Sequence, residues 1–269
     1  MTLADVTAPA WADVEGVLLD ADDTLYDTRS AMHRAGARAA ASLWPDADPE
    51  RVARAGIRFR DDPEGHFAAY TRGELEFAEM RRARVAELAT WLEQEVDDGL
   101  WDAFEAAYEP AFLGALDAFP DVRPALGAWG SAGVRVGILT NSSSAYTALK
   151  LEASGLADLF DVVCSTDTLG FGKPDPRAFH EACRRLGTDP ARTGYVGDEA
   201  RTDPLGAHDA GMPTAWLVRE TEPTATVPGP AAGTDGTEAT EVLARGIPVV
   251  RTLAEVVALR DLGRGLGAG

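Results

Sequence analysis

The chain has little cysteine and no long apolar run. Its two cysteines, Cys164 and Cys183, lie far apart and form no CxxC pair. This spacing argues against a disulfide scaffold and against a zinc site built from thiolates. No apolar stretch approaches the ~18–20 residues that a helix needs to span a bilayer. The two absences predict a globular protein that is stabilised by its hydrophobic core.

Basic residues are also few. The 269 residues include 25 Lys and Arg against 44 Asp and Glu, which gives a formal net charge of −19. Such a chain is poorly suited to hold a nucleic-acid backbone or an anionic membrane, since both need clustered cations. The first 16 residues contain three acids and no Lys or Arg, so neither a secretory signal nor a transit peptide is expected. We therefore expect a cytoplasmic monomer or homodimer with neither a nucleic-acid nor a membrane partner.

Lysine is the scarcest basic residue. Only Lys150 and Lys173 are lysines, and arginine occupies the other basic positions. A lysine that persists against this bias is a candidate for a role that needs a compact point charge. Lys173 lies in a loop segment, whereas Lys150 lies on a predicted helix, where we expect a solvated surface residue.

Short apolar runs alternate with helical patterns over most of the chain. Strands are expected at 15–20, 134–140, 160–165, 193–197 and 214–218, and helices at 122–132, 145–154, 176–186 and 204–210. This alternation is typical of parallel βαβ units with right-handed crossovers, and it predicts an α/β fold with a doubly wound, Rossmann-like parallel sheet. Ligands of such sheets bind beyond the carboxyl ends of the strands.

The interval 27–119 breaks this alternation. It contains no convincing strand, and its clearest amphipathic helical patterns cover 64–70, 74–95 and 100–108. We therefore expect an α-helical cap domain here, inserted into a catalytic core of residues 1–26 and 120–269. The cap holds 11 of the 20 aromatic residues. These either fill its helical core or, in part, line a substrate pocket.

The end of the core has a different composition. Residues 220–241 are rich in Thr, Pro and Gly and poor in bulky apolar side chains, so we expect a flexible loop. Residues 247–259 then resume a strand–helix pattern that is expected to complete the core.

Polar residues follow the expected strands at the points where chemistry is anticipated. They are Asp20 and Asp22 after the first strand, Thr140 and Asn141 after the second, Lys173 shortly before the helix at 176–186, and Asp198 and Asp203 after the fourth strand. Each fragment alone has an ordinary structural explanation, such as helix capping. All of them in this order at the ends of parallel strands indicate a single site.

In this order the residues resemble the motifs of the haloacid dehalogenase-like hydrolase superfamily, in particular its helical-cap phosphatases. The resemblance covers roughly residues 15–26 and 120–260. It implies a Mg²⁺ ion and a role for each residue. The metal ligands would be Asp20, the backbone carbonyl of Asp22, and Asp198 with Asp203 in support; Thr140, Asn141 and Lys173 would bind phosphate; and Asp20, Asp22, Thr140 and Lys173 would be catalytic.

The residue types suit phosphoryl transfer independently of the resemblance. A carboxylate can act as the nucleophile and form an aspartyl phosphate, which Asp20 at a strand tip is placed to do. Alternation along an extended segment puts Asp22 on the same side, where it can protonate the leaving oxygen and later activate water. A carboxylate that attacks a dianion needs a counter-charge, and Mg²⁺ prefers oxygen ligands.

Other chemistries of the superfamily can be weighed against this one. The acid at Asp22 argues against a dehalogenase, whose relatives lack it, and the lysine-free cap excludes a Schiff-base phosphonate hydrolase. A phosphomutase stays open because His33 lies near the position of a mutase histidine, and so does a non-catalytic binding protein. The expected function is hydrolysis of a small phosphorylated metabolite: a nucleotide, flavin mononucleotide or sugar phosphate.

Three details are left open by the sequence. Asp23 stands where many relatives have Gly, either as a third acid of the site or as a turn residue. Glu199 either supports the metal or begins a helix. Arg81 and Arg84 share a helix face and either meet an anionic substrate or pair with local acids such as Glu87.

Overall fold

The computed structural model describes residues 11–72, 74–219 and 236–266. Within this part the chain forms two compact units. One contains the described residues up to Tyr26 and from Ala118 onward, and the other spans Asp27–Asp117. The expected cap ends at 119, two residues beyond the second unit.

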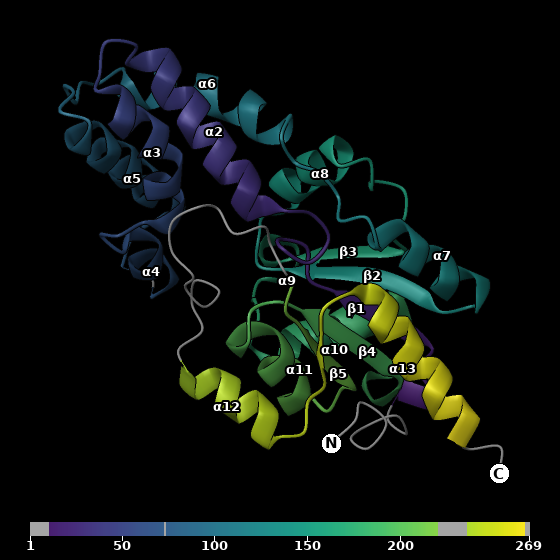
Figure 1. Ribbon diagram of the computed structural model, residues 1–269. Coiled ribbons are helices and arrows are strands. Elements are labelled where there is room, and N and C mark those ends of the chain that lie inside the picture. The colour runs from purple at the N-terminus through teal and green to yellow at the C-terminus, as the bar shows by residue number, and fades with distance from the viewer. Residues whose placement is uncertain (1–10, 73, 220–235, 267–269) are drawn as a thin grey trace. The chain divides into compact units, whose positions relative to one another are not determined.

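A sheet of six parallel strands forms the centre of the first unit, in the order β3-β2-β1-β4-β5-β6 (Figure 1). The strands are β1 Gly16–Leu19, β2 Arg135–Thr140, β3 Val162–Ser165, β4 Thr193–Gly197, β5 Thr214–Leu217 and β6 Val249–Val250. The strand order reverses direction after β3, so the predicted doubly wound α/β fold is confirmed. All four residues of β1 are buried, which explains its continuous apolar sequence.

Helices cover both faces of this sheet (Figure 1). They are α7 Val122–Ser131, α8 Ser144–Ala153, α9 Thr166–Leu169, α10 Pro176–Leu186, α11 Gly206–Asp209, α12 Gly236–Ala244 and α13 Leu253–Leu266, with a 3₁₀ turn at Pro190–Arg192. α7 packs against α13, and α10 packs against β1, β2 and β3. The helix expected at 204–210 is instead a π-helical turn, Arg201–Leu205, followed by α11.

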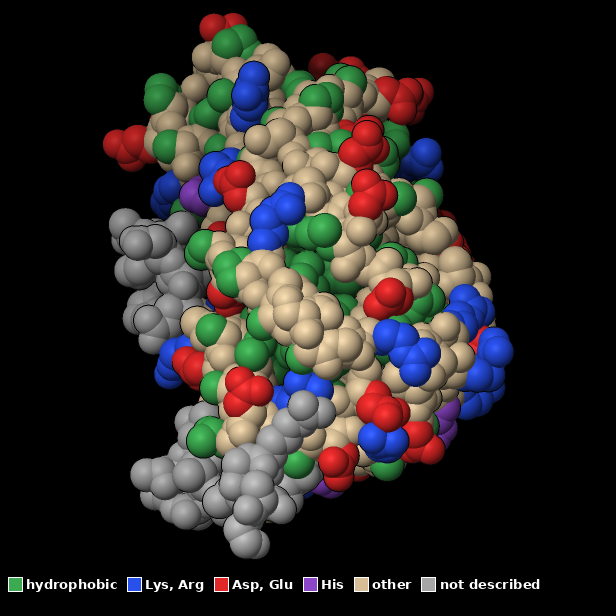
Figure 2. All heavy atoms as spheres, turned by 90° about the vertical axis from the view of Figure 1, so that its right-hand side faces the viewer, with side chains coloured by type: hydrophobic (Ala, Val, Ile, Leu, Met, Phe, Trp, Pro, Cys, Tyr) green, Lys and Arg blue, Asp and Glu red, His purple; other side chains and the backbone are tan. Residues whose placement is uncertain are grey.

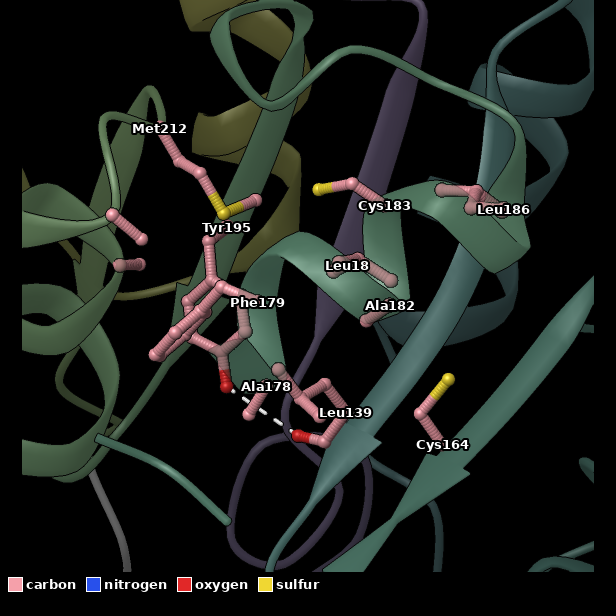
Figure 3. Close-up of a cluster of buried hydrophobic side chains, with 12 residues drawn as sticks. Leu18, Leu139, Cys164, Ala178, Phe179, Ala182, Cys183, Leu186, Tyr195 and Met212 are labelled. Atoms are coloured by element: carbon pink, nitrogen blue, oxygen red, sulfur yellow. Dashed lines mark hydrogen bonds between the residues drawn. The ribbon is translucent and has the colours of Figure 1, made fainter. Parts of the chain in front are cut away.

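The core under α10 shows why this helix is placed well by its sequence. Its first turn has Pro176 and an Asp175 side chain that accepts from the backbone N–H of Arg177, and it ends at Gly187 with φ 73°. Its apolar face packs on residues from β1, β2, β3 and β4 (Figure 3). Among them are Leu18, Leu139, Cys164 and Tyr195. Both cysteines are buried here as free thiols.

The second unit is helical, and its described residues contain no strand. The helices are α2 Thr28–Leu43, α3 Pro49–Asp61, α4 His66–Thr71, α5 Phe77–Trp91 and α6 Leu100–Leu113. Phe59, Phe104, Tyr108 and Phe112 are buried, and each ring contacts the next at centroid distances of 5.1–5.8 Å. Much of the aromatic content therefore fills the helical core. α6 continues through Pro110 to Leu113, beyond the expected end at 108.

Two of the three arginines of α5, Arg81 and Arg84, are buried in this unit. Arg81 donates to Glu105 at 2.6 Å and lies over the ring of Tyr108. Arg84 lies over the ring of Phe59 and donates to its carbonyl. Local pairing thus accounts for Arg81, although its partner is not Glu87, which pairs with Arg58.

The flexible loop expected at 220–241 needs correction. Residues 236–241 of the predicted flexible loop form most of α12, where Val242 packs beside Trp216 and Ile247. The remainder of that loop, 220–235, lies outside the described residues.

The surface is rich in charged side chains, and the helices match a sequence without long apolar segments. Figure 2 shows Asp and Glu interspersed with Lys and Arg over the face that it draws. Among the residues that the structure describes, no helix is both long enough and apolar enough to cross a membrane.

Candidate active site

The sheet register brings three strand ends together. β1 lies between β2 and β4, and Leu19 is paired with both Ile138 and Val196. Residue 20 therefore leaves the sheet level with the ends of both neighbours, and the segments that carry Thr140 and Asp198 flank it. The central position of β1 makes Asp20 the middle of this edge.

Asp20 and Lys173 form a buried ion pair. The ammonium Nζ lies 2.5 Å from Asp20 Oδ1, and the Lys173 side chain is only 3% exposed. Burial, opposed by Lys173 and reinforced by Asp203 and Asp22, raises the pKa of Asp20 to about 7. Burial also opposes the charge on Lys173, but Asp20 and Asp203 outweigh it and raise the pKa of the ammonium well above its usual value. Two carboxylates, Asp20 and Asp203, thus share one cation.

Lys173 is fixed at both ends. Its Nζ also donates to Asp203 Oδ1 at 2.6 Å and to the hydroxyl of Tyr195 at 3.0 Å, so three separate acceptors surround it. Its backbone is held by the Asn141 amide, which accepts from the Lys173 N–H at 2.8 Å and donates to its carbonyl at 2.9 Å. Asn141 thus has a positioning role that the sequence did not predict, and its phosphate contact stays a prediction.

Tyr195 was missed by the sequence analysis. It lies in β4, inside an apolar run, and its hydroxyl donates to Asp203 Oδ1 at 2.8 Å. Figure 3 shows the same hydroxyl directed toward the carbonyl of Leu139, 3.4 Å away. The only signal available was a Tyr three residues before Asp198 in a fully buried strand.

Asp203 uses both of its oxygens. Oδ1 accepts from Lys173 and Tyr195, and Oδ2 accepts from the backbone N–H of Glu199 at 2.9 Å. A Cβ at Gly197 would overlap the Asp203 carboxylate, so this position requires glycine. The Glu199 carboxylate accepts from Thr202 at 3.0 Å, beside the π-helical turn. This contact favours a local structural role for Glu199.

Three carboxylates converge with the geometry of a cation site. Oxygens of Asp20, Asp198 and Asp203 all lie within 4.8 Å of one another. An oxygen-only donor set with excess negative charge suits Mg²⁺, and a dication would favour the ionised form of Asp20. The Asp22 side chain is not in this group, so its predicted contact through the backbone carbonyl stays a prediction. The carbonyl of Asp198 accepts from Trp216 Nε1 at 2.8 Å, which anchors this loop to β5.

Asp22 has a cation of its own, and the expectation for Lys150 was wrong. Lys150, on α8, is 3% exposed, and its Nζ contacts both Asp22 oxygens at 2.6 and 2.7 Å. The residue is buried because it shares the inward face of α8 with Thr147 and Leu151. The rarity of lysine in this chain was the signal that could have indicated a buried role for Lys150.

The turn after Asp22 explains the residue at position 23. Asp23 has φ 55°, in the left-handed region that favours glycine, and its N–H donates to the carbonyl of Tyr26 at 3.0 Å. The Gly that many relatives carry would suit the same conformation. Asp23 therefore acts as a turn residue here.

Thr140 completes the set at the end of β2. It is buried, and its Oγ1 accepts from the backbone N–H of Ser142 at 3.1 Å. The hydroxyl proton is left to donate in another direction, as the predicted phosphate contact requires. His33, the residue behind the mutase alternative, lies on α2 of the second unit.

A carboxylate at the tip of the central strand, with a buried ammonium and further acids around it, lies where α/β sheets bind their ligands. The chain belongs to the haloacid dehalogenase-like hydrolases, because the model of that family matches residues 14–211. The predictions of this family and of a hydrolytic enzyme are thus confirmed.

Several known proteins are similar to this chain. The glyceraldehyde 3-phosphate phosphatase of Methanopyrus kandleri is 28% identical over 206 residues, covering 77% of this chain and 84% of that protein. The phosphoglycolate phosphatase of Escherichia coli is 30% identical over 220 residues, covering 76% and 81%. The HAD-hydrolase YfnB of Bacillus subtilis, solved bound to magnesium, has a TM-score of 0.68 at 20% identity and covers 92% of this chain and 99% of that one.

Proposed function

We propose that the protein is a Mg²⁺-dependent phosphomonoesterase that acts on a small phosphorylated metabolite through an aspartyl phosphate. The observation that carries the proposal is the pair of acids after β1. Asp20 and Asp22 are two residues apart, yet each contacts a different lysine, Lys173 and Lys150. This separation gives the two acids distinct surroundings, as a nucleophile and a proton carrier require.

Asp20 is the proposed nucleophile. Lys173 and Asp203 hold its carboxylate at the strand tip, and Lys173 would also stabilise the charge of the transferring phosphoryl group. Thr140 would donate its hydroxyl proton to a phosphate oxygen. Attack by Asp20 breaks the bond between phosphorus and the ester oxygen and leaves the phosphoryl group on the carboxylate.

Asp22 is the proposed proton carrier. It would give a proton to the departing ester oxygen and then take one from the water that attacks the aspartyl phosphate. Its side chain is one-third exposed, which permits access for substrate and water. Hydrolysis of the intermediate returns Asp20 and releases inorganic phosphate.

The residues that would hold Mg²⁺ are Asp20, Asp198 and the backbone carbonyl of Asp22, with Asp203 in support. When bound, the ion supplies positive charge that neutralises the phosphate and the carboxylates around it. The excess of acids over cations at this edge supports the assignment.

The names of the relatives support a phosphorylated small molecule as substrate. Two relatives aligned over most of their length are phosphatases of three- and two-carbon phosphate esters. The charge of −19 supports a cytoplasmic small-molecule enzyme over a nucleic-acid-binding protein.

A metabolite panel tests the proposal. Phosphate release would be measured with Mg²⁺ from glyceraldehyde 3-phosphate, phosphoglycolate, nucleoside monophosphates, flavin mononucleotide and sugar phosphates, with Asp20→Asn as the control. We expect at least one ester to be hydrolysed by the wild type and none by the variant. Transfer of the phosphoryl group to a second sugar hydroxyl would identify a mutase, and no turnover on any ester would identify a binding protein.

A further inference from the structure

Lys150 is the second lysine of the chain, and no step of the proposed chemistry assigns it a role of its own. It projects from α8 toward the loop that follows β1. Both oxygens of Asp22 accept from its Nζ, at 2.6 and 2.7 Å. The rings of Tyr26 and Tyr146 lie beside the ammonium, with centroids 5.7 and 5.3 Å away. All four residues belong to the unit that contains the sheet.

We infer that Lys150 is a positioning residue that fixes the direction of the Asp22 carboxylate for proton transfer. The inference rests on the proposed function, in which Asp22 serves the leaving oxygen and then water. A proton carrier must come within about 2.6–3.2 Å of its partner. A contact to both oxygens restricts rotation of the short Asp22 side chain, which is one-third exposed.

The surroundings of Lys150 favour this role over a purely stabilising ion pair. Burying an ammonium costs free energy that pairing with a partly exposed carboxylate only partly offsets. The chain nevertheless places both of its lysines in buried positions, each against one acid of the first loop. The aromatic faces of Tyr26 and Tyr146 stabilise the cation in the position from which it reaches Asp22.

The helix that carries Lys150 is itself tied to the site. α8 begins directly after the Thr140–Asn141 segment, and Ser143 caps it by accepting from the N–H of Tyr146. Thr147, one turn before Lys150, donates to the carbonyl of Ser143 at 2.7 Å. Lys150 therefore fixes Asp22 relative to the end of β2, where the phosphate would bind.

Three variants separate positioning from stability. Lys150→Met removes the charge at similar length, and Lys150→Arg keeps a cation that can contact both carboxylate oxygens and stack on the aromatic rings. Glu152→Gln is the matched control, because Glu152 is an exposed residue of the same helix. Each would be assayed with Mg²⁺ on an alkyl phosphate and on 4-nitrophenyl phosphate, whose leaving group departs without a proton.

Lys150→Met is expected to lower kcat on the alkyl ester at least 10-fold. The same change should slow formation of the aspartyl phosphate from the aryl ester much less, and KM on the alkyl ester should change less than threefold. Lys150→Arg should recover most of the lost rate, and Glu152→Gln should match the wild type. The double variant Asp22→Asn with Lys150→Met should be no slower than Asp22→Asn alone, because Lys150 acts through Asp22.

Other outcomes overturn the inference. Equal losses in the rate of aspartyl phosphate formation from both esters, together with a lowered melting temperature, would mean that Lys150 only stabilises the fold. Multiplicative losses in the double variant would mean that it acts elsewhere. If Asp22→Asn slows the alkyl ester but Lys150→Met does not, the inference alone fails. If Asp22→Asn has no effect, the proposed role of Asp22 fails and the inference falls with it.

Discussion

The raised pKa of Asp20 makes the stability of the metal-free protein depend on pH. A folded-state pKa of about 7 against an ordinary value of 3.8 means that the folded chain holds this proton more tightly than the unfolded chain. The resulting stabilisation is complete below about pH 4 and is lost as pH rises through 7. A shift of this size corresponds to about 4 kcal/mol in total.

About half of this effect falls between pH 5.5 and 8.5, a range in which the chain keeps a net negative charge. Over this range the contribution of Asp20 to the free energy of unfolding should fall by about 2 kcal/mol. The melting temperature should fall by about 4–8 °C as a result. The proposed Mg²⁺ ion would bind the ionised site, so its stabilising effect should grow over the same interval, reaching about 2.7 kcal/mol at 100 times its Kd.

Scanning calorimetry at four pH values, with chelator and with Mg²⁺, measures both trends. Asp20→Asn is the control, because it removes the titrating group and leaves the background titration of the other acids. The wild type should lose more stability than the variant as pH rises, and only without metal. Parallel curves for the two proteins, or a Mg²⁺ effect that is the same at pH 5.5 and 8.5, would refute the reasoning.

Three further predictions concern single residues. Asp20→Asn should abolish turnover, whereas Asp22→Asn should lower kcat ~10²–10⁴-fold and leave aryl esters able to form a phosphorylated protein that mass spectrometry detects; substantial activity in Asp20→Asn would contradict the assignment. Lys173→Arg should lose on the order of 10²-fold in kcat with an unchanged circular dichroism spectrum, because a planar fork cannot meet three acceptors placed around one ammonium; near-wild-type rates would place Lys173 outside the mechanism. Asp23→Gly should keep kcat within about twofold and change stability by less than about 1 kcal/mol, since it relieves a left-handed φ but adds backbone freedom; a large loss of rate would make Asp23 part of the site.

The sheet was predictable because each long strand is a short apolar run that can be recognised in the sequence. β4 was placed at both ends, and α10 was placed from Pro176 to Leu186, since proline, capping Asp175 and a terminal glycine delimit it. The helical turn after β4 was predicted with the wrong type, because a π-helical segment has no distinct apolar period. α6 was ended too early at Tyr108, because packing of its aromatic face outweighs the helix-breaking tendency of Pro110.

The site was only partly predictable, for a reason that Lys150 illustrates. The acid that Lys150 contacts, Asp22, lies 128 residues earlier in the sequence. A lysine on a helix is usually solvated, and only the fold brings α8 against the first loop. Tyr195 was missed for the same reason, since in sequence it is one more bulky residue of a buried strand. The motif residues were easier to predict, because the carboxyl ends of parallel strands lie at the same edge of the sheet.

The indole of Trp216 links an apolar cluster of the core to the loop that carries Asp198. Its ring packs with Ala200, Leu205 and Val242 in the outer half of the sheet, while its N–H holds the carbonyl of Asp198. A methyl group lost from that apolar cluster would therefore loosen the loop that carries Asp198, a proposed ligand of Mg²⁺. We expect such a variant to need more Mg²⁺ for activity, although none of the proposed metal ligands has been changed.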